Sequence, residues 1–207
     1  MTARKLAVVS AGLGQPSSSR LLADRLTEAT LGRLREQGIE AEVAVIELRD
    51  LAHDITNNLL TGFPSPKLEE ALAAVTGADG LIAVTPTFTT SYSGLFKSFI
   101  DVIDTQALTD LPVLLGATGG TERHSLALDY AMRPLFTYLH AVVVPTSVYA
   151  ASADWGSADG DSSLPDRVGR AAGELASLMR ESDRSGRVND PFALPAGFSP
   201  VGGFGSQ

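Results

Sequence analysis

The segment Ala83-Val-Thr-Pro-Thr-Phe-Thr-Thr-Ser-Tyr-Ser-Gly-Leu-Phe-Lys-Ser-Phe-Ile-Asp-Val-Ile103 decides the fold of this chain. It predicts a buried strand that stops at Pro86, a hydroxyl-rich loop, and a helix that begins near Gly94. Open α/β sheets hold their ligands where strands end in such loops. Because the loop has no Cys, His or carboxylate, binding there must use backbone amides, hydroxyls and the faces of Phe88 and Tyr92. This chemistry suits a flat polar ring better than attack on a substrate.

The same alternation of strand and helix runs through most of the chain. Strands are expected at five short apolar runs, residues 6–9, 41–46, 80–85, 112–117 and 141–148. Helices are expected at residues 19–37, 67–75, 94–103, 125–140 and 164–181. Nearly continuous apolar strands that alternate with helices predict a parallel sheet covered on both faces. Five strands in roughly 180 residues favour a flavodoxin-like three-layer α/β sandwich, strand order 2-1-3-4-5, over a barrel, which needs about 250 residues.

Length and composition limit the possible functions. The 207 residues predict one domain, placed at 1–186, and a Pro- and Gly-containing tail at 187–207 that is poorly ordered or draped over an interface. The net charge of −8 argues against nonspecific binding to nucleic acid or anionic membranes. The absence of cysteine excludes disulfides and thiolate catalysis, and three histidines argue against a metal cluster. With no signal-peptide pattern and no transmembrane-length apolar run, a cytoplasmic location is expected.

Three loops follow strand ends, at residues 10–19, 86–94 and 118–123. In a flavodoxin-like sheet these loops meet at the carboxyl edge, near the point where the strand order reverses. Ser17, Ser18 and Ser19 open a helix, where free N–H groups and the positive helix end bind phosphate, but ordinary N-capping by serine explains them equally well. Gly119 and Gly120 allow a planar ligand to approach the backbone, although a flexible turn is the commoner meaning of a Gly-Gly pair.

No side chain is expected to act as a catalytic acid, base or nucleophile. His124 follows the third loop, but it has no carboxylate three or four residues away on a helix face, which favours a surface role. Trp155, the only tryptophan, is interpreted as either a lid or an interface plug.

Two segments of the chain resemble the NAD(P)H-dependent FMN reductases that serve two-component flavin monooxygenases, such as alkanesulfonate and luciferase-like systems. They are residues 78–98 and residues 117–121, the latter continuing through His124 and residues 126–135. The resemblance implies a flavodoxin-like fold, FMN, NAD(P)H as co-substrate, hydride transfer from nicotinamide to flavin N5, and delivery of reduced FMN to a partner monooxygenase. It also implies a homodimer or homotetramer, with Tyr130 in a π-bulged helix at the interface.

The resemblance also implies a set of flavin-binding residues. It assigns the ring to the loop Thr85 to Thr89, which includes Pro86, Thr87 and Phe88, with Tyr92 and Ser93 closing that loop. It assigns the pyrimidine side to Thr118, Gly119, Gly120 and Thr121, and the phosphate to Ser10, Ser17, Ser18 and Ser19. The first loop departs from the family, because the arginine of a Gly-Ser-x-Arg pattern is missing and Gln15 is expected to replace it. No metal ligand and no residue that separates NADH from NADPH is predicted.

Three alternative functions remain open from the sequence. The first is an enzyme that retains FMN and reduces quinones, azo dyes or metal ions. The second is a flavodoxin-like electron carrier without NAD(P)H activity, although the segment Thr87-Phe-Thr-Thr90 resembles the aromatic and acidic loops of flavodoxins less closely. The third is a phosphate-binding structural homologue that has lost flavin.

Overall fold

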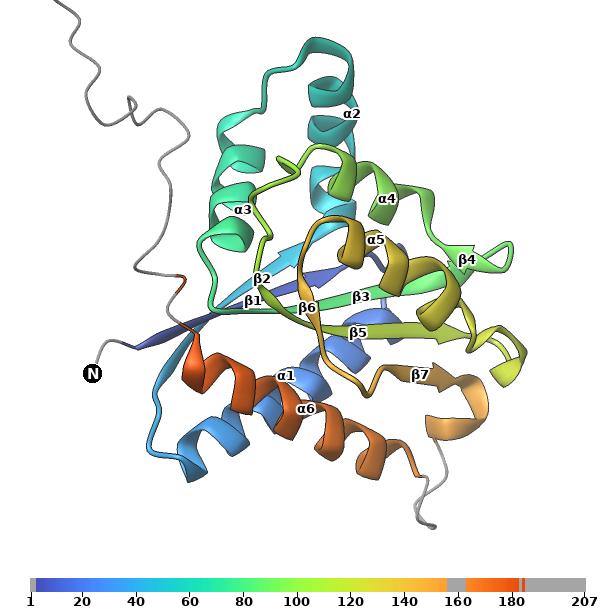
Figure 1. Cartoon of the computed structure of the whole chain (residues 1–207). Coiled ribbons are helices and arrows are strands. Elements are labelled where there is room, and N and C mark those ends of the chain that lie inside the picture. The colour runs from blue at the N-terminus through green and yellow to red at the C-terminus, as the bar shows by residue number, and fades with distance from the viewer. Residues whose placement is uncertain (1–2, 156–162, 183, 185–207) are drawn as a thin grey trace, which may run out of the picture.

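The computed structural model describes residues 3–155, 163–182 and 184 (Figure 1). The strands are β1 (Arg4–Ser10), β2 (Ala41–Glu47), β3 (Gly80–Phe88), β4 (Ser91–Tyr92), β5 (Pro112–Gly119), β6 (Val142–Val143) and β7 (Val148–Ala151). The α-helices are α1 (Ser18–Glu36), α2 (Ala52–Thr61), α3 (Pro66–Thr76), α4 (Gly94–Asp101), α5 (Arg133–Tyr138) and α6 (Leu164–Glu181). Shorter helical turns are η1 (Leu48–Leu51), η2 (Glu122–His124), η3 (Leu128–Met132) and η4 (Ser152–Trp155). The predicted tail at 187–207 lies outside the described residues, so its boundary stays a prediction.

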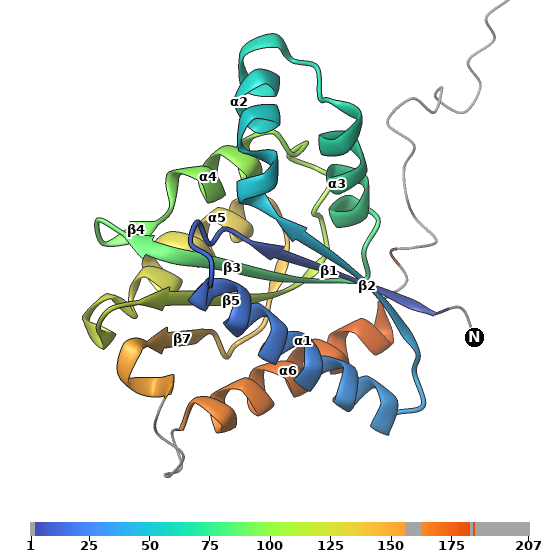
Figure 2. The same cartoon turned by 180° about the vertical axis from the view of Figure 1, so that it is seen from behind.

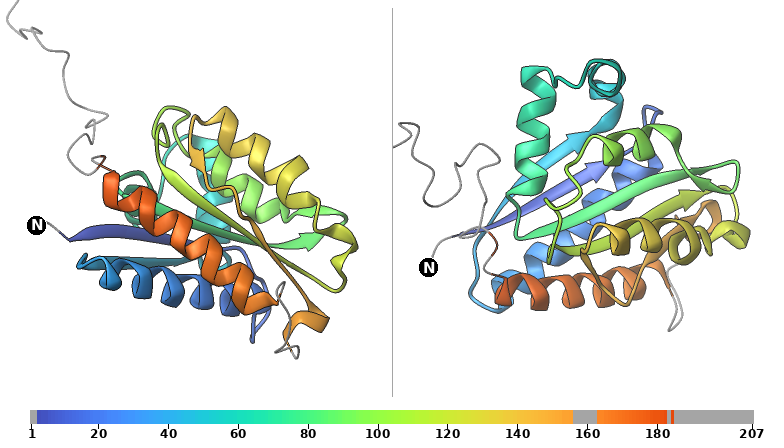
Figure 3. Two further views of the ribbon diagram at one scale, coloured as in Figure 1. Left: turned by 60° about the horizontal axis from the view of Figure 1, so that its bottom comes forward. Right: turned by 45° about the horizontal axis from the view of Figure 1, so that its top comes forward.

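The sheet lies between two layers of helices. Its strands run in the order β2-β1-β3-β5-β6, with β7 also paired to β5 and β4 paired to β3. Helices α1 and α6 lie side by side on one face, while α3, α4 and α5 cover the other (Figures 2 and 3). Each face has its own apolar core, because alternate side chains of a strand point to opposite sides. On β3, Leu81 and Ala83 join the core beneath α3 and α4, whereas Ile82 and Val84 join the core beneath α1 and α6.

The flavodoxin-like class and the relative order of the predicted strands are confirmed, but the sheet has seven strands instead of five. The predicted strand at 141–148 is divided into β6 and β7, with Pro145 between them. Proline has no N–H to donate to a ladder, and the neighbouring Thr146 N–H is instead bonded to the Glu174 carboxylate at 2.7 Å. The chain therefore leaves β5 after β6 and returns to it as β7.

The third predicted strand is also longer than expected, because residues 86–88 belong to β3 and not to a loop. The chain then folds back as the short antiparallel strand β4. Thr89 and Thr90 form the turn with φ angles of 47° and 71°. Two positive φ values suit a type I′ hairpin turn, which usually takes Asn or Gly. The ligand loop expected at 86–94 is thus largely a β-hairpin.

Two helical regions differ from the sequence prediction. The predicted helix at 125–140 is divided into the π-helical turn η3 and α5, with Pro134 in the first turn of α5, where its missing N–H costs nothing. The turn η1 and helix α2 were not predicted. Their buried Leu48, Leu51 and Ile55 recur at helical spacing, so the signal was present in the sequence.

None of the described helices combines the length and apolar content that a membrane span requires.

Phe96 lies in the apolar core beneath α3 and α4, where its packing can be tested. Its side chain is fully buried, and its ring centroid lies 6.0 Å from that of Tyr92 and 6.3 Å from that of Phe136. We expect Phe96→Ala to lower the free energy of unfolding by about 3–5 kcal/mol, because it leaves a cavity among buried rings. The matched control is Phe63→Ala, which removes a ring that is 79% exposed. Its free energy of unfolding, measured with urea, should change by no more than about 0.5 kcal/mol. Equal losses in the two variants would contradict this packing.

Candidate functional site

The register of the parallel strands brings the three predicted loops to one edge of the sheet. Ser10 at the end of β1 pairs with Val84 of β3. On the other side of β3, Pro86 pairs with Thr118 of β5, and Gly119 pairs in turn with Ala151 of β7. Figure 1 shows β3, β5 and β7 pointing to the same edge. The carboxyl ends of these strands therefore form one continuous rim.

Hydrogen bonds join the loops to one another. The hydroxyls of Ser19 and Thr118, both buried, lie 2.8 Å apart and connect the first loop to the third. The Ala11 N–H donates to the Val84 carbonyl at 2.9 Å, which fixes the start of the first loop against β3. The first loop is thus hydrogen-bonded both to the third loop and to β3, the strand that leads into the second loop.

A cavity of about 350 Å³ opens between these loops, within the range of small-molecule sites. Its lining residues are Gly12, Leu13, Gly14, Pro16, Ser17, Ser18, Ser19, Pro86, Thr87, Phe88, Thr118, Gly119, Gly120, Ala150, Ser152 and Trp155. None of these described lining residues carries an ionisable side chain. The cavity therefore offers backbone amides, hydroxyls and aromatic faces, as the sequence predicted for the second loop.

Nine of the fifteen predicted site residues line this cavity, namely Ser17, Ser18, Ser19, Pro86, Thr87, Phe88, Thr118, Gly119 and Gly120. The other six do not, namely Ser10, Gln15, Thr89, Tyr92, Ser93 and Thr121. The lining residues that were not among the predicted contacts are Gly12, Leu13, Gly14 and Pro16 in the first loop, Ala150 in β7, and Ser152 and Trp155 on η4. The segment that follows β7 forms a fourth loop of the site. The rule that ligand loops follow strand ends applies to this fourth loop as well.

Two of the residues outside the lining stabilise the β-hairpin and α4. The Ser93 N–H donates to Thr85 Oγ1 at 3.0 Å, and Ser93 Oγ accepts the Phe96 N–H at 3.2 Å, so Ser93 caps α4. The Tyr92 ring packs against Phe96, as expected of a core side chain. Phe88, by contrast, is 47% exposed and lines the cavity.

Gln15 faces Arg49 and not the cavity. With its amide orientation assigned from the hydrogen-bond network, the Gln15 oxygen accepts from Arg49 Nη2 at 2.5 Å and Nη1 at 3.1 Å. Arg49 Nη1 also donates to the Gly14 carbonyl at 3.3 Å, and its Nε pairs with Asp50 at 3.3 Å. A guanidinium from η1 therefore lies against the first loop.

Arg20, on the first turn of α1, is engaged with carboxylates. It bonds to Asp24 at 2.8 Å and to Glu47. The hydrogen bond that Arg20 donates to Asp24 raises the pKa of Arg20 above its usual value. The charges of Asp24 and Glu47 act in the same direction, although burial opposes them.

Trp155 forms a wall of the cavity. It lies on η4, and the guanidinium carbon of Arg25 lies 5.0 Å from the centroid of its ring. This cation–π contact holds the indole against α1. Of the two interpretations from sequence, the position beside the cavity is closer to a lid than to an interface plug.

The cavity fits the two ends of a flavin mononucleotide. Ser17 Oγ accepts the Arg20 N–H at 3.2 Å, so the N-capping interpretation is confirmed, while Ser18 stands exposed at the first turn of the 19-residue helix α1, where the positive helix end favours an anion. Towards the ring end, Thr87 Oγ1 is buried and has no hydrogen-bond partner among the described residues. A ligand with ring N–H or carbonyl groups would satisfy it.

Comparisons with known proteins give the family. The family model described as NADPH-dependent FMN reductase matches residues 4–156. The chain is 41% identical over 151 residues to an "FMN reductase (NADPH)" of Pseudomonas aeruginosa, covering 73% of this chain and 78% of that protein. It is 40% identical over 151 residues to the "NADH-dependent FMN reductase SfnF" of Pseudomonas fluorescens, with the same coverage of each chain.

Two solved structures are similar to this chain in fold and in sequence. An oxidoreductase of Corynebacterium diphtheriae is 48% identical, with a TM-score of 0.85 over 88% of this chain and 100% of that one. The apo form of the NADH:FMN oxidoreductase EmoB is 28% identical, with a TM-score of 0.71 over 87% of this chain and 90% of that one. Together with the family match, these likenesses confirm the expected enzyme class, oxidoreductase, with FMN as flavin and NAD(P)H as electron donor. The chain belongs to the NADPH-dependent FMN reductase family.

Proposed function

We propose that FMN binds in the cavity between the first, second and third loops, and that the chain releases reduced FMN to a partner monooxygenase. The observation that carries the placement is the convergence of uncharged donors from three strand ends on one cavity of about 350 Å³. Ser17, Ser18 and Ser19 at the start of α1 would hold the phosphate. Thr87, Phe88, Gly119 and Gly120 would hold the ring.

Catalysis in this proposal needs binding and orientation from the protein. When bound, FMN supplies the redox chemistry by accepting a hydride at N5 from the nicotinamide. In this proposal the backbone N–H groups of Gly119 and Gly120 would stabilise negative charge at the pyrimidine side. Phe88, half exposed at the cavity wall, leaves a face on which the nicotinamide can be oriented. The remaining predicted contacts, Ser10, Gln15, Thr89, Tyr92, Ser93 and Thr121, stay predictions.

Homo-oligomerisation is part of the same proposal. The π-helical turn expected from the resemblance is found at Leu128–Met132, and the side chain of Tyr130 in its centre is 78% exposed. An exposed aromatic on a π-helical turn supports a subunit contact there, in a homodimer or homotetramer. A cytoplasmic location stays a prediction.

A charge placed at the start of α1 tests the phosphate site. We expect Ser18→Asp to raise the Kd for FMN at least about tenfold, because a carboxylate repels the phosphate, and to leave the Kd for riboflavin within about twofold, since riboflavin has no phosphate. The thermal stability of the apoprotein should not fall, because a negative charge is favourable at a helix N-terminus. The measurement is titration of flavin fluorescence.

The control for net charge is Ser177→Asp, which adds the same charge on α6 at an exposed position and should leave the affinity for FMN unchanged. Equal weakening of FMN and riboflavin by Ser18→Asp would show that the phosphate does not lie at this helix start.

The release of reduced flavin tests the delivery function. Enzyme and FMN are mixed without oxygen, with NADH and NADPH in separate experiments, and then passed through a membrane that retains the protein. We expect most of the reduced flavin in the filtrate, because the cavity binds its ligand without a charged side chain. Retention of reduced flavin by the protein would favour the alternative of an FMN-retaining reductase, and failure to oxidise either coenzyme would favour an electron carrier.

A further inference from the structure

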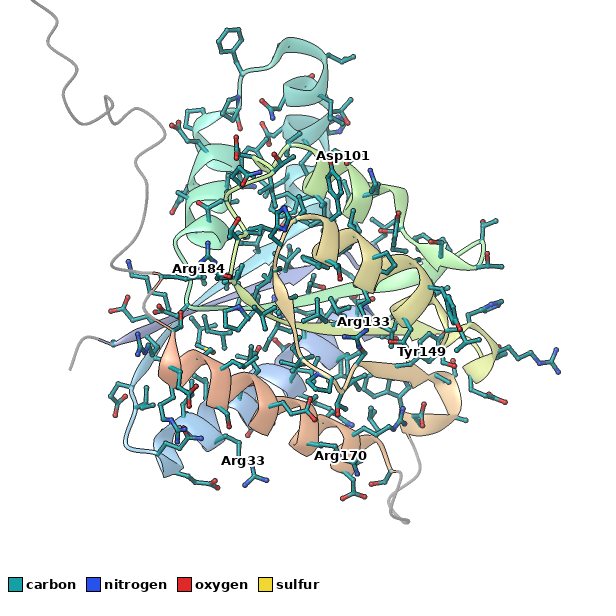
Figure 4. The ribbon with its side chains drawn as sticks, viewed as in Figure 1. Arg33, Asp101, Arg133, Tyr149, Arg170 and Arg184 are labelled. Carbon is teal, nitrogen blue, oxygen red and sulfur yellow. The ribbon has the colours of Figure 1, made fainter. Side chains whose placement is uncertain are left out.

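Tyr149, on β7, lies directly behind the third loop (Figure 4). Its side chain is only 4% exposed, and its hydroxyl donates to the Thr121 carbonyl at 3.0 Å. A Cβ added to Gly119 would lie 2.0 Å from the same hydroxyl oxygen. The phenol therefore occupies the space that a side chain at Gly119 would need, and the absence of that side chain is a condition of the contact.

The backbone of Tyr149 is fixed to the fourth loop. Arg167 Nη1, from α6, donates to the Tyr149 carbonyl at 2.6 Å, and its Nη2 pairs with Asp154 at 2.6 Å. The other Asp154 oxygen accepts the Ala151 N–H at 2.7 Å. These bonds connect the third loop, through Tyr149 and Arg167, to the turn that carries Trp155. Two walls of the cavity thus share one buried anchor.

We propose that Tyr149 is a positioning residue for the flavin ring, which it orients through the backbone of residues 119–121 and without touching the ring. This inference rests on the proposed placement of FMN in the cavity. Because the peptide group is planar and trans, a Thr121 carbonyl held towards Tyr149 turns the following N–H in the opposite direction. The hydroxyl therefore holds the segment 119–121 at its Thr121 carbonyl, and it sets the direction of the Glu122 N–H in the same peptide group. At the other end of the segment, Gly119 packs against the same hydroxyl.

Removal of the hydroxyl alone tests the proposal. We expect Tyr149→Phe to raise both the Kd and the KM for FMN about two- to tenfold, the range for one lost hydrogen bond, while kcat stays within about twofold of the native value. The visible absorption band of the bound flavin should shift, since the ring meets differently oriented amides. Tyr138→Phe is the matched control, because it removes the same atom from a side chain that is 73% exposed. It should leave the Kd and KM for FMN and the flavin absorption band unchanged.

A double-mutant cycle tests the steric part. Gly119→Ala should weaken FMN binding strongly in the native background and less in the Tyr149→Phe background. The hydroxyl oxygen 2.0 Å from the added Cβ is then gone, which leaves the ring carbon at 3.1 Å as the nearest atom. Additive effects of the two substitutions would overturn the proposal. If Tyr149→Phe does not fold, as judged by circular dichroism, Arg167→Lys gives the second test. Lysine cannot reach both the Tyr149 carbonyl and Asp154, so the affinity for FMN should fall; unchanged affinity in this variant overturns the proposal.

The experiments distinguish a wrong role for Tyr149 from a wrong placement of FMN. If only the positioning role of Tyr149 is wrong, Ser18→Asp weakens FMN binding while Tyr149→Phe leaves the Kd and the absorption band unchanged. If the placement is wrong, neither variant changes the Kd for FMN. Both results overturn the role of Tyr149, and only the second also overturns the proposed site.

Discussion

The hydrogen-bonded ladder between β3 and β5 is the constraint on which the site depends. It places Pro86 beside Thr118, so that the second and third loops leave the sheet at the same height. A slip of one residue would send every side chain of a strand to the opposite face. Both faces of β3 are buried by different helices, which makes such a slip costly. The burial of apolar side chains far from the cavity therefore fixes the geometry of the cavity rim.

The cavity combines a helix N-terminus, the start of α1, with uncharged walls, in a chain of net charge −8. A guanidinium inside the cavity would need a partner whenever the ligand is absent, because an unpaired buried charge is expensive. Amides and hydroxyls avoid this cost. The cations nearest to the first loop, Arg20 and Arg49, are instead paired with carboxylates outside it. An uncharged site of this kind suits the proposed function, in which the flavin would enter and leave in each cycle.

Sequence patterns predicted the fold where burial decides the structure. The strands at 80–85 and 112–117 and the helix at 164–181 are found close to their expected bounds, because long apolar runs and helical periodicity are strong signals. The hairpin at Thr89 and Thr90 was missed because two β-branched residues with positive φ contradict the preferences from which turns are predicted.

The fourth loop, after β7, shows why part of the site could not be predicted from the sequence. The strand ending at Ala151 was expected to stop at 148, so Ser152 and Trp155 were placed in a long loop without a position relative to the sheet. The division at Pro145 shifts the second half of that strand towards the ligand edge. Only the pairing of β7 with Gly116 to Gly119 of β5 reveals this shift. Strand pairing is a long-range contact, so the local sequence pattern does not predict it.

The glycine pair of the third loop illustrates how one motif contains two requirements. A Cβ at Gly119 would collide with the Tyr149 hydroxyl, whereas a Cβ at Gly120 would meet no atom within 4 Å. Gly119 is therefore required by the protein interior, on the side of β7. Gly120 has no such internal reason to lack a side chain, but it lines the cavity. Its bare backbone leaves the cavity open at this point, and in the proposed site a flat ring would approach it there.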